Sequence, residues 1–222
     1  MEDRALVVLS GGQDSTTALF WAKKRFESVS AVSFDYGQRH KVELLCAEKI
    51  ADIASVPHEI VNASFINALA SSALTRPGVD IETLPGQLPN TFVPGRNLFF
   101  LSMAAVYAFQ RGIRNLVAGV CMTDYSGYPD CRQDFVQSLE ETLRLAMGFD
   151  FQIYTPLMFM TKAEEVKMAV GLGPRCMEAL ANSHTCYEGT FPPCGKCPAC
   201  VLRDKGFTQA GVPDPLIVRA SK

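Results

Sequence analysis

The stretch Ala5-Leu6-Val7-Val8-Leu9-Ser10-Gly11-Gly12-Gln13-Asp14-Ser15-Thr16-Thr17 decides the fold of this chain. Residues 5–9 form an apolar run that is typical of a buried parallel strand, and residues 16–22 predict a helix. Small residues between a strand and a helix make an anion site, because glycine lets the backbone approach phosphate and the helix N-terminus offers free N–H groups. The simpler alternative is a turn that only caps the helix, with Ser10 or Asp14 as the cap.

The same stretch excludes one large class of nucleotide enzymes. It does not contain the G-x-x-x-x-G-K-[ST] pattern of a Walker A loop, so it offers no lysine for a γ-phosphate. We therefore expect a site that binds the phosphates of a nucleotide without the chemistry of a Walker-type motor or kinase.

Composition sets the class of protein. The 222 residues are 48% hydrophobic, which suits one globular domain with a small appendage. A formal net charge of -2 argues against a broad nucleic-acid surface. The first residues, 1–4, lack a signal-peptide layout, and the apolar stretch 98–108 is too short to span a bilayer. We expect a cytoplasmic protein, whose eight cysteines are not paired in disulfides.

Strand and helix patterns alternate along the chain. After the first strand, the pattern predicts strands at 30–34, 59–61, 115–119 and 151–154. It predicts helices at 38–54, 97–110, 133–147 and 161–170, the last with Thr161 as its N-cap. This alternation favours an α/β fold, a parallel sheet with helices on both faces. Residues 75–94 carry four prolines and two glycines without a clear period, and we interpret them as a lid or an edge of the active site.

A cysteine-rich tail follows residue 171. Its Cys-x-x-Cys-x-x-Cys run, with a fourth cysteine seven intervening residues upstream, predicts a closed structural metal site formed by Cys186, Cys194, Cys197 and Cys200. Zinc is favoured, and an iron–sulfur cluster is the alternative. His184 could replace one thiolate, although a polar loop residue is the simpler interpretation. We divide the chain into a nucleotide-binding domain at 1–175 and a zinc-binding subdomain at 176–222.

A metal site of this kind could grip RNA or could close the wall of an active site. Basic residues near the ligands are few, mainly Lys196, Arg203 and Lys205, which favours the second role. Of the other cysteines, Cys46 is most simply a core residue of its helix.

The motif Ser10-Gly11-Gly12-Gln13-Asp14-Ser15 resembles the PP-loop signature of the ATP pyrophosphatase family. The resemblance implies a Rossmann-like sheet of the adenine nucleotide alpha hydrolase type, and cleavage of ATP between its α and β phosphates with transfer of AMP to a carbonyl or carboxyl oxygen. It also implies Mg²⁺, for which Asp14 or Asp35 could be a ligand. The residues implied to bind ATP are Leu9, Ser10, Gly11, Gly12, Gln13, Asp14, Ser15, Thr16 and Thr17.

Further motifs are similar to one branch of that family, the 7-cyano-7-deazaguanine synthases of queuosine biosynthesis. They are Phe34-Asp35-Tyr36-Gly37-Gln38-Arg39-His40 with Glu43, Val93-Pro94-Gly95-Arg96-Asn97, the segment 124–132, Thr155-Pro156-Leu157, and Thr161-Lys162-Ala163-Glu164. With the cysteine tail, the resemblance covers residues 9–207. It implies an ATP-dependent ligase that converts 7-carboxy-7-deazaguanine and ammonia into the nitrile by way of an amide. ATP is then consumed with AMP- or ADP-type products and phosphate or pyrophosphate.

The resemblance also suggests roles for individual residues. The expected catalytic residues are Ser10, Asp14, Ser15, Arg96 and Lys162, and the expected substrate-binding residues are Tyr36, Arg39, Arg96, Asp124, Tyr125, Tyr128, Asp130 and Arg132. Our hypothesis is that Asp130 or Asp124 accepts hydrogen bonds from the donor edge of the guanine-like base, while Tyr125 or Tyr128 stacks on it. Without the resemblance, a Gly/Pro turn with solvated aspartates is the simpler interpretation. His40 could assist proton transfer or only make local hydrogen bonds.

The expected partners are the small-molecule substrate and free ammonia, with no nucleic acid and no membrane, in the homodimer that is usual for the family. Two alternatives stay open. One is a PP-loop tRNA thiolase, which would need a catalytic cysteine such as Cys121 or Cys131 and a basic surface. The other is a non-catalytic module that binds a nucleotide and releases no pyrophosphate.

Overall fold

The computed structural model describes residues 3–38, 41–69, 72, 73, 75, 88, 90–123 and 127–221. Its centre is a sheet of five strands, all paired in parallel: β1 (Arg4–Val8), β2 (Ser28–Asp35), β3 (His58–Asn62), β4 (Asn115–Ala118) and β5 (Gln152–Tyr154). The strand order is β3-β2-β1-β4-β5, so the chain moves outward from β1 on one side and then returns to its other side. The predicted parallel α/β sheet is confirmed.

Strand β1 lies in the middle of the sheet and is buried on both faces. Val8 is paired with Val32 of β2 and with Ala118 of β4, and Leu6 and Val7 have no exposed surface. A strand covered on both faces needs apolar side chains at every position, which explains the unbroken run 5–9. The strand order reverses at β1 and β4, and ligands of open α/β sheets bind beyond the carboxyl ends of strands at such a switch point.

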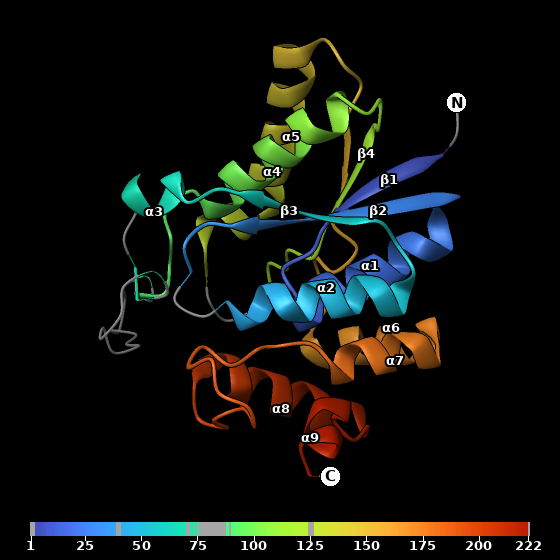
Figure 1. Ribbon diagram of the computed structural model, residues 1–222, viewed down its shortest axis with the longest axis vertical. Helices are drawn as coiled ribbons and strands as arrows, with labels where there is room; N and C mark the ends of the chain where they lie inside the picture. The colour runs from blue at the N-terminus through green and yellow to red at the C-terminus, as the bar shows by residue number, and fades with distance from the viewer. Residues whose placement is uncertain are drawn as a thin grey trace.

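Two layers of helices cover the sheet (Figure 1). The helices α1 (Gln13–Arg25), α2 (Val42–Ala54), α6 (Lys162–Leu172) and α7 (Pro174–Ala181) contribute to one buried cluster with Val7. The helices α4 (Arg96–Phe109) and α5 (Gln133–Met147) contribute to the cluster on the other face, with Leu6. Helices on both faces are therefore confirmed.

The remaining helices are short or belong to the tail. They are α3 (Phe65–Leu69), the 3-10 helix η1 (Pro129–Cys131), α8 (Pro198–Ala210) and α9 (Pro215–Ala220). The tail lies below the sheet in Figure 1, where α8 packs on α6 and α9 packs on α7. The interpretation of the sequence contained no helix after residue 170. The suggested division between residues 175 and 176 falls inside α7, and the two-part division stays a prediction.

The predicted bounds agree best where local signals are strong. Helix α5 spans 133–147 as predicted, and α6 begins at Lys162 behind a Thr161 N-cap. The cap is a full capping box, in which the Thr161 hydroxyl accepts from the Glu164 N–H and the Glu164 carboxylate accepts from the Thr161 N–H. Helix α2 begins at Val42 instead of residue 38. Thr161 therefore sets the start of the helix that carries Lys162.

The buried Arg203 joins α8 and the start of α9 to the end of α7. Its guanidinium donates to both oxygens of Asp214, at 2.7 and 2.9 Å, and to the hydroxyls of Ser183 and Thr185 at 2.8 and 2.9 Å. A fifth bond reaches the Leu180 carbonyl at 3.1 Å. One side chain thus joins α7, α8, α9 and the loop before the cysteines. This basic residue is used inside the fold and is not available to a nucleic acid.

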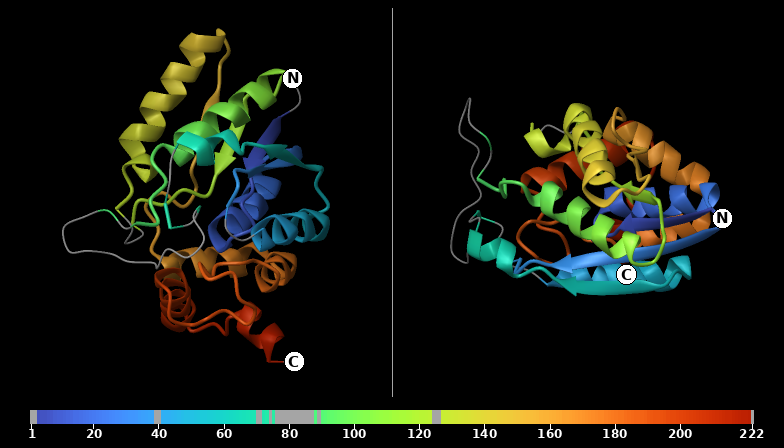
Figure 2. Two further views of the ribbon diagram at one scale, coloured as in Figure 1. Left: turned by 60° about the vertical axis from the view of Figure 1, so that its left-hand side comes forward. Right: turned by 90° about the horizontal axis from the view of Figure 1, so that it is seen from above.

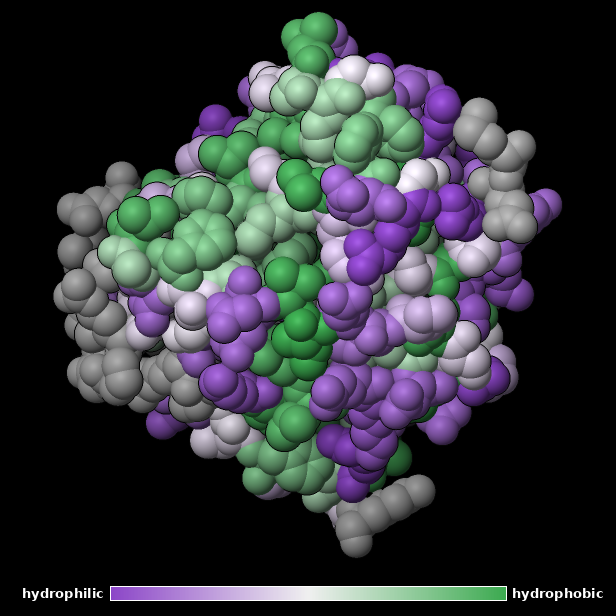
Figure 3. Space-filling view, turned by 45° about the horizontal axis from the view of Figure 1, so that its top comes forward, coloured by the Kyte–Doolittle hydropathy of each residue, from purple (hydrophilic) through white to green (hydrophobic). Residues whose placement is uncertain are grey.

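The surface carries apolar side chains that are not covered within this chain. Figure 3 shows hydrophobic areas next to a band of hydrophilic side chains on one face. Val106 and Phe109 of α4 are 54% and 39% exposed, and Leu145 of α5 is 76% exposed. The expected homodimer stays a prediction. In the described part of the chain, no helix combines the length and the hydropathy needed to cross a membrane.

Candidate active site

A cavity of about 670 Å³ lies at the carboxyl ends of β1 and β4, between the sheet and the tail. The loop after β1 forms one side of it. The Ser10 N–H donates to the Ser15 hydroxyl at 3.1 Å, and the two hydroxyls lie 3.0 Å apart. Gly12 is the N-cap of α1 and makes no side-chain cap hydrogen bond. The first turn of α1 therefore faces the cavity through its backbone, as an anion site requires.

Two glycines allow the close packing behind this loop. Gly11 has φ +81°, and a Cβ at this residue would lie 2.2 Å from the carbonyl oxygen of Glu43 in α2. Gly119, just after β4, lies so close to α1 that a Cβ would come within 2.7 Å of the Ser15 nitrogen. The loop is therefore held between α2 and the end of β4 with no room for a side chain at either glycine.

A lysine from α6 reaches the same loop. The Lys162 ammonium lies 2.5 Å from Asp14 Oδ1 and 2.9 Å from Glu165 Oε2. Glu165 is 1% exposed and also accepts from the Thr17 hydroxyl at 3.4 Å. Lys162 and Asp14 both line the cavity, so one cation and one carboxylate stand beside the phosphate loop. Asp35 instead pairs with the exposed Lys41 at 2.9 Å, and the hydrogen bond from Lys41 lowers the pKa of Asp35.

The Gln13 amide points to a ligand in this cavity. Gln13 is 4% exposed, it lines the cavity, and its Nε2 has no hydrogen-bond partner among the described residues. A buried amide N–H without a partner is costly, so such a group is expected to bind a ligand or water.

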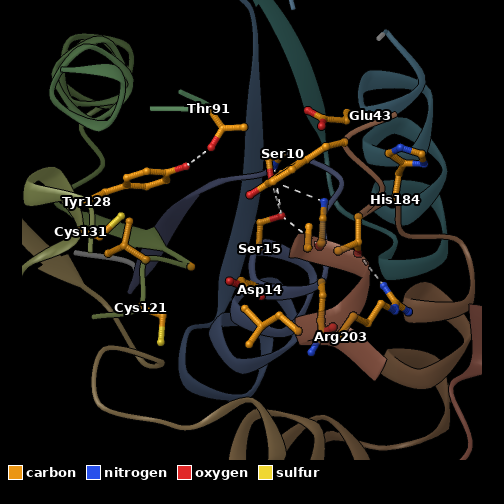
Figure 4. A pocket seen from close by; sticks show the side chains of 18 of the residues that line it. Ser10, Asp14, Ser15, Glu43, Thr91, Cys121, Tyr128, Cys131, His184 and Arg203 are labelled. Carbon is orange, nitrogen blue, oxygen red and sulfur yellow. Dashed lines mark hydrogen bonds between the residues drawn. The ribbon is translucent and has the colours of Figure 1, made fainter. Parts of the chain in front are cut away.

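Aromatic and charged side chains from other segments form the rest of the cavity wall. Tyr36 follows β2, Glu43 lies in the first turn of α2, Arg96 begins α4, and Tyr128 precedes η1. Tyr187, next to Cys186, completes this wall. Figure 4 shows Glu43 and Ser10 on one side of the cavity, with Tyr128 and Thr91 across it. The phenol of Tyr128 is fixed by a 2.6 Å hydrogen bond with the Thr91 hydroxyl.

Burial shifts the pKa values of the titratable side chains on this wall. Desolvation raises the pKa of Glu43 to about 7, although the positive charge of Arg96 opposes the shift. For Arg96, burial lowers the pKa, but its interactions with Tyr36 and two further phenols outweigh burial and raise the pKa overall. Burial likewise raises the pKa of Tyr36, Tyr128 and Tyr187. A permanent cation thus faces a carboxyl group that exchanges its proton near neutral pH.

The structure brings nine of the suggested catalytic, ATP-binding and substrate-binding residues together at one cavity. The cavity is lined by Ser10, Gly12, Gln13, Asp14, Ser15, Tyr36, Arg96, Tyr128 and Lys162. Arg39, His40, Asp124 and Tyr125 lie outside the described residues, as does most of the suggested lid at 75–94. Their roles stay predictions.

Asp130 and Arg132 do not contribute to the described cavity wall. Asp130 is 7% exposed, and its Oδ2 accepts from the Asn97 N–H at 3.0 Å, which fixes the start of α4. Arg132 is the N-cap residue of α5. Neither is among the described residues that line the cavity. Sequence reasoning left Glu43, Thr91 and Tyr187 without a role, although Glu43 stood beside a quoted motif.

The four cysteines of the tail form a cluster that could hold a metal ion. The Sγ atoms of Cys186, Cys194, Cys197 and Cys200 all lie within 4.8 Å of one another. Two of the sulfurs also accept backbone N–H groups, Cys186 from Cys194 at 3.4 Å and Cys194 from Cys197 at 3.3 Å. His184 is outside this group. Its Nε2 lies 2.7 Å from the Cys186 carbonyl, and its backbone N–H donates to the Gly11 carbonyl at 2.8 Å.

The His184 bond connects the two halves of the site. It links the tail directly to the phosphate loop, and Cys186 and Tyr187 stand on the cavity wall two and three residues later. Figure 2 shows the tail as a layer below the sheet, in contact with the helices of the core. The cysteine cluster is thus placed to close one side of the cavity.

Comparison with known proteins identifies the family. The family model described as "Queuosine biosynthesis protein QueC" matches residues 4–211. This chain belongs to the QueC family. It is 56% identical to the 7-cyano-7-deazaguanine synthase of Laribacter hongkongensis, across 98% of this chain and 95% of that protein. It is 50% identical to the synthase of the same name from Bacillus subtilis, across 94% and 95% of the two chains.

Solved structures support the fold. A 4-thiouridine synthetase, solved as an RNA complex with bound ATP, aligns with a TM-score of 0.54 and 17% identity over 99% of this chain and 53% of that one. At this identity the likeness shows the fold alone. Members of the QueC family are enzymes of queuosine biosynthesis, and the close relatives are named as synthases of a nitrile.

Proposed function

We propose that this chain is an ATP-dependent carbon–nitrogen ligase that converts 7-carboxy-7-deazaguanine and ammonia into 7-cyano-7-deazaguanine. The observation that carries the proposal is a single cavity with two unlike sides. One is a phosphate loop without a Walker lysine, and the other is a wall of tyrosines with one arginine and one carboxyl group. The first side suits the triphosphate of ATP, and the second suits a flat, polar base.

The chemistry explains why both sides are needed. A carboxylate is a poor electrophile, because its charge repels a nucleophile and its oxide is a poor leaving group. In the first half-reaction, a substrate carboxylate oxygen attacks the α-phosphorus of ATP, and pyrophosphate leaves. Ammonia then attacks the acyl carbon, AMP leaves with the original oxygen, and a lost proton gives the neutral amide.

The second half-reaction removes the remaining oxygen. The amide oxygen attacks the α-phosphorus of a second ATP, and pyrophosphate leaves again. Loss of AMP and of the two N–H protons then forms the nitrile. One nucleotide site therefore serves both halves, and two ATP are converted to two AMP and two pyrophosphate for each product.

The residues of this chain supply charge and position. The N–H groups of the loop at Ser10–Ser15 and the Lys162 ammonium would hold the phosphates as negative charge shifts to the leaving pyrophosphate. Asp14 stands where a carboxylate could ligate Mg²⁺, which offsets phosphate charge when bound. The unpartnered Gln13 amide would donate to the nucleotide.

Zinc is the proposed ion of the cysteine cluster. Zn–S bonds of about 2.3 Å place the sulfurs of a tetrahedron about 3.8 Å apart. The cluster fits this spacing, with Cys194 and Cys200 Sγ 4.0 Å apart and all four sulfurs within 4.8 Å. An iron–sulfur cluster spreads its thiolates over several irons and needs wider separations. With four protein ligands the ion is structural, and metal analysis of the purified protein tests its identity.

One assay tests the activity. The protein is incubated with ATP, ammonium and 7-carboxy-7-deazaguanine, and nitrile, AMP and pyrophosphate are quantified. We expect all three, with AMP release that depends on the deazapurine. Absence of AMP would reject the ligase.

Two other outcomes identify the alternatives. AMP formation that needs tRNA and a cysteine outside the metal cluster would indicate a thiolase. ATP binding without pyrophosphate would indicate a nucleotide-binding module.

A further inference from the structure

The cavity wall beside the phosphate loop contains a carboxyl group with no assigned role. Glu43 lies in the first turn of α2, lines the cavity and is half-buried. Within the described chain, its carboxylate makes no hydrogen bond or ion pair, and Arg96 is the charged group recorded as acting on it. Its helix turn is fixed to the loop, because the Glu43 carbonyl packs against Gly11. A desolvated acceptor at a fixed distance from the phosphates suggests a ligand that donates hydrogen bonds.

Arg96 supplies the complementary group beside it. It begins α4, and its guanidinium interacts with the phenols of Tyr36, Tyr128 and Tyr187. These contacts orient the guanidinium without a carboxylate partner in direct contact among the described residues. The cavity therefore presents a fixed donor and a fixed acceptor on one wall.

We propose that Glu43 and Arg96 together recognise the pairing edge of the guanine-like base, Glu43 accepting from its ring N–H and 2-amino group and Arg96 donating to its 6-oxo oxygen. This inference rests on the proposed function. The edge presents one acceptor followed by two donors. The Arg96 guanidinium offers a donor to the 6-oxo acceptor of the base. The two oxygens of the Glu43 carboxylate can accept from the two donors of the base, its ring N–H and its 2-amino group. The substrate carboxyl group, carried on the other ring, is then directed toward Ser10–Ser15.

In this proposal Glu43, and not Asp130, accepts hydrogen bonds from the donor edge of the base. Asp130 is not among the described residues that line the cavity, and its Oδ2 accepts the Asn97 N–H. Asp124, the other aspartate considered, lies outside the described residues and serves as the competing candidate.

A thermodynamic cycle tests the proposal by combining a substitution in the protein with removal of one group from the ligand. Calorimetry measures the Kd of 7-carboxy-7-deazaguanine and of its analogue without the 2-amino group, for the wild type and for Glu43→Gln. We expect the wild type to bind the parent compound roughly 10- to 100-fold more tightly than the analogue, because the analogue loses one charge-assisted hydrogen bond. In Glu43→Gln this preference should fall below about threefold, while the Kd for ATP stays unchanged.

Four control variants separate this role from others. Arg96→Lys should weaken both compounds equally, since both keep the 6-oxo oxygen. Glu48→Gln, an exposed position on the same helix, and Asp130→Asn should keep the wild-type preference, provided circular dichroism shows each folded. An unchanged preference in Glu43→Gln overturns the proposal. Loss of preference in Asp124→Asn with retention in Glu43→Gln would assign the role to Asp124.

The binding readout is independent of turnover. If the wild type binds the base with this preference but forms neither AMP nor nitrile, the proposed function fails and the assignment of Glu43 stands. If it forms nitrile but shows no preference for the 2-amino group, the function stands and the assignment fails.

Discussion

The two sides of the cavity are built in different ways. The phosphate loop is one continuous segment, residues 10–15, between a strand and a helix. The rest of the cavity wall joins Tyr36 and Glu43, which are close in the sequence, with Arg96, Tyr128 and Tyr187 from distant segments. The loop depends on its own backbone geometry, whereas the wall depends on how the sheet, α4 and the tail pack together. Changes in the tail should therefore affect the wall first.

Arg203→Ala should have the largest effect, because it disrupts the packing of the tail that carries Tyr187. It removes five hydrogen bonds and leaves Asp214 buried without its cation. We expect a loss of about 3–5 kcal/mol in the free energy of unfolding, measured by urea titration. Weaker binding of the deazapurine than of ATP in the folded fraction would place the damage on the wall.

A surface pair provides the control for this change. Arg114→Ala removes an ion pair with Asp150 that is 41% and 67% exposed, and it should cost less than about 1 kcal/mol. Equal losses in the two variants would show that Arg203 does not hold α7, α8 and α9 together.

Gly11→Ala should disturb the phosphate loop instead of the rest of the cavity wall. A Cβ would lie 2.2 Å from the Glu43 carbonyl and would require the residue to keep φ +81°. The loop must then shift, and a displacement of about 1 Å at a reacting centre costs ~10²-fold in turnover. We expect this loss in ATP-dependent AMP release. Gly171→Ala, in α6 with open space around its Cβ position, should keep activity, and equal losses in both would contradict the packing argument.

The same contrast explains what could be predicted from the sequence. The strands, α5, the Thr161 cap and the phosphate loop follow from local patterns, and the structure has them within a few residues. The positions of Glu43 and Tyr187 on the cavity wall could not be predicted, because they depend on how separate segments pack together. Asp130 shows the reverse case: its motif position suggested a binding role, which stays a prediction, while its contact with the Asn97 N–H is set by packing. Four cysteines at regular spacing were predictable because the ligands themselves specify the geometry.

The raised pKa of Glu43 predicts how the stability of the folded chain depends on pH. Its pKa is about 7 in the folded chain against an ordinary value of 4.5, because burial disfavours the charged form. The folded state then holds this proton more tightly than the unfolded state, so stability falls as pH rises from about 4.5 to about 7. Glu43→Gln should lack this fall and be more stable than the wild type at pH 8 by about 2 kcal/mol, allowing for partial solvent access.

Thermal unfolding between pH 4.5 and pH 8 measures this effect. The difference in Tm between Glu43→Gln and the wild type should grow as pH rises. Glu48→Gln, at an exposed position on the same helix, should show no such trend, and a constant difference for Glu43→Gln would reject a buried, proton-exchanging carboxyl group.

The smallest expected effect tests whether the phosphate loop depends on the N-cap of α6. Thr161→Ala removes the capping box of α6 and should cost about 1 kcal/mol of stability. Because Lys162 is the next residue and contacts Asp14, fraying of this turn should also raise the KM for ATP and leave the Kd of the deazapurine unchanged. Thr142→Ala, an exposed threonine inside α5, is the matched control. If Thr161→Ala instead weakened the base and spared ATP, the two sides of the cavity would not be positioned independently, and their different construction would have no functional consequence.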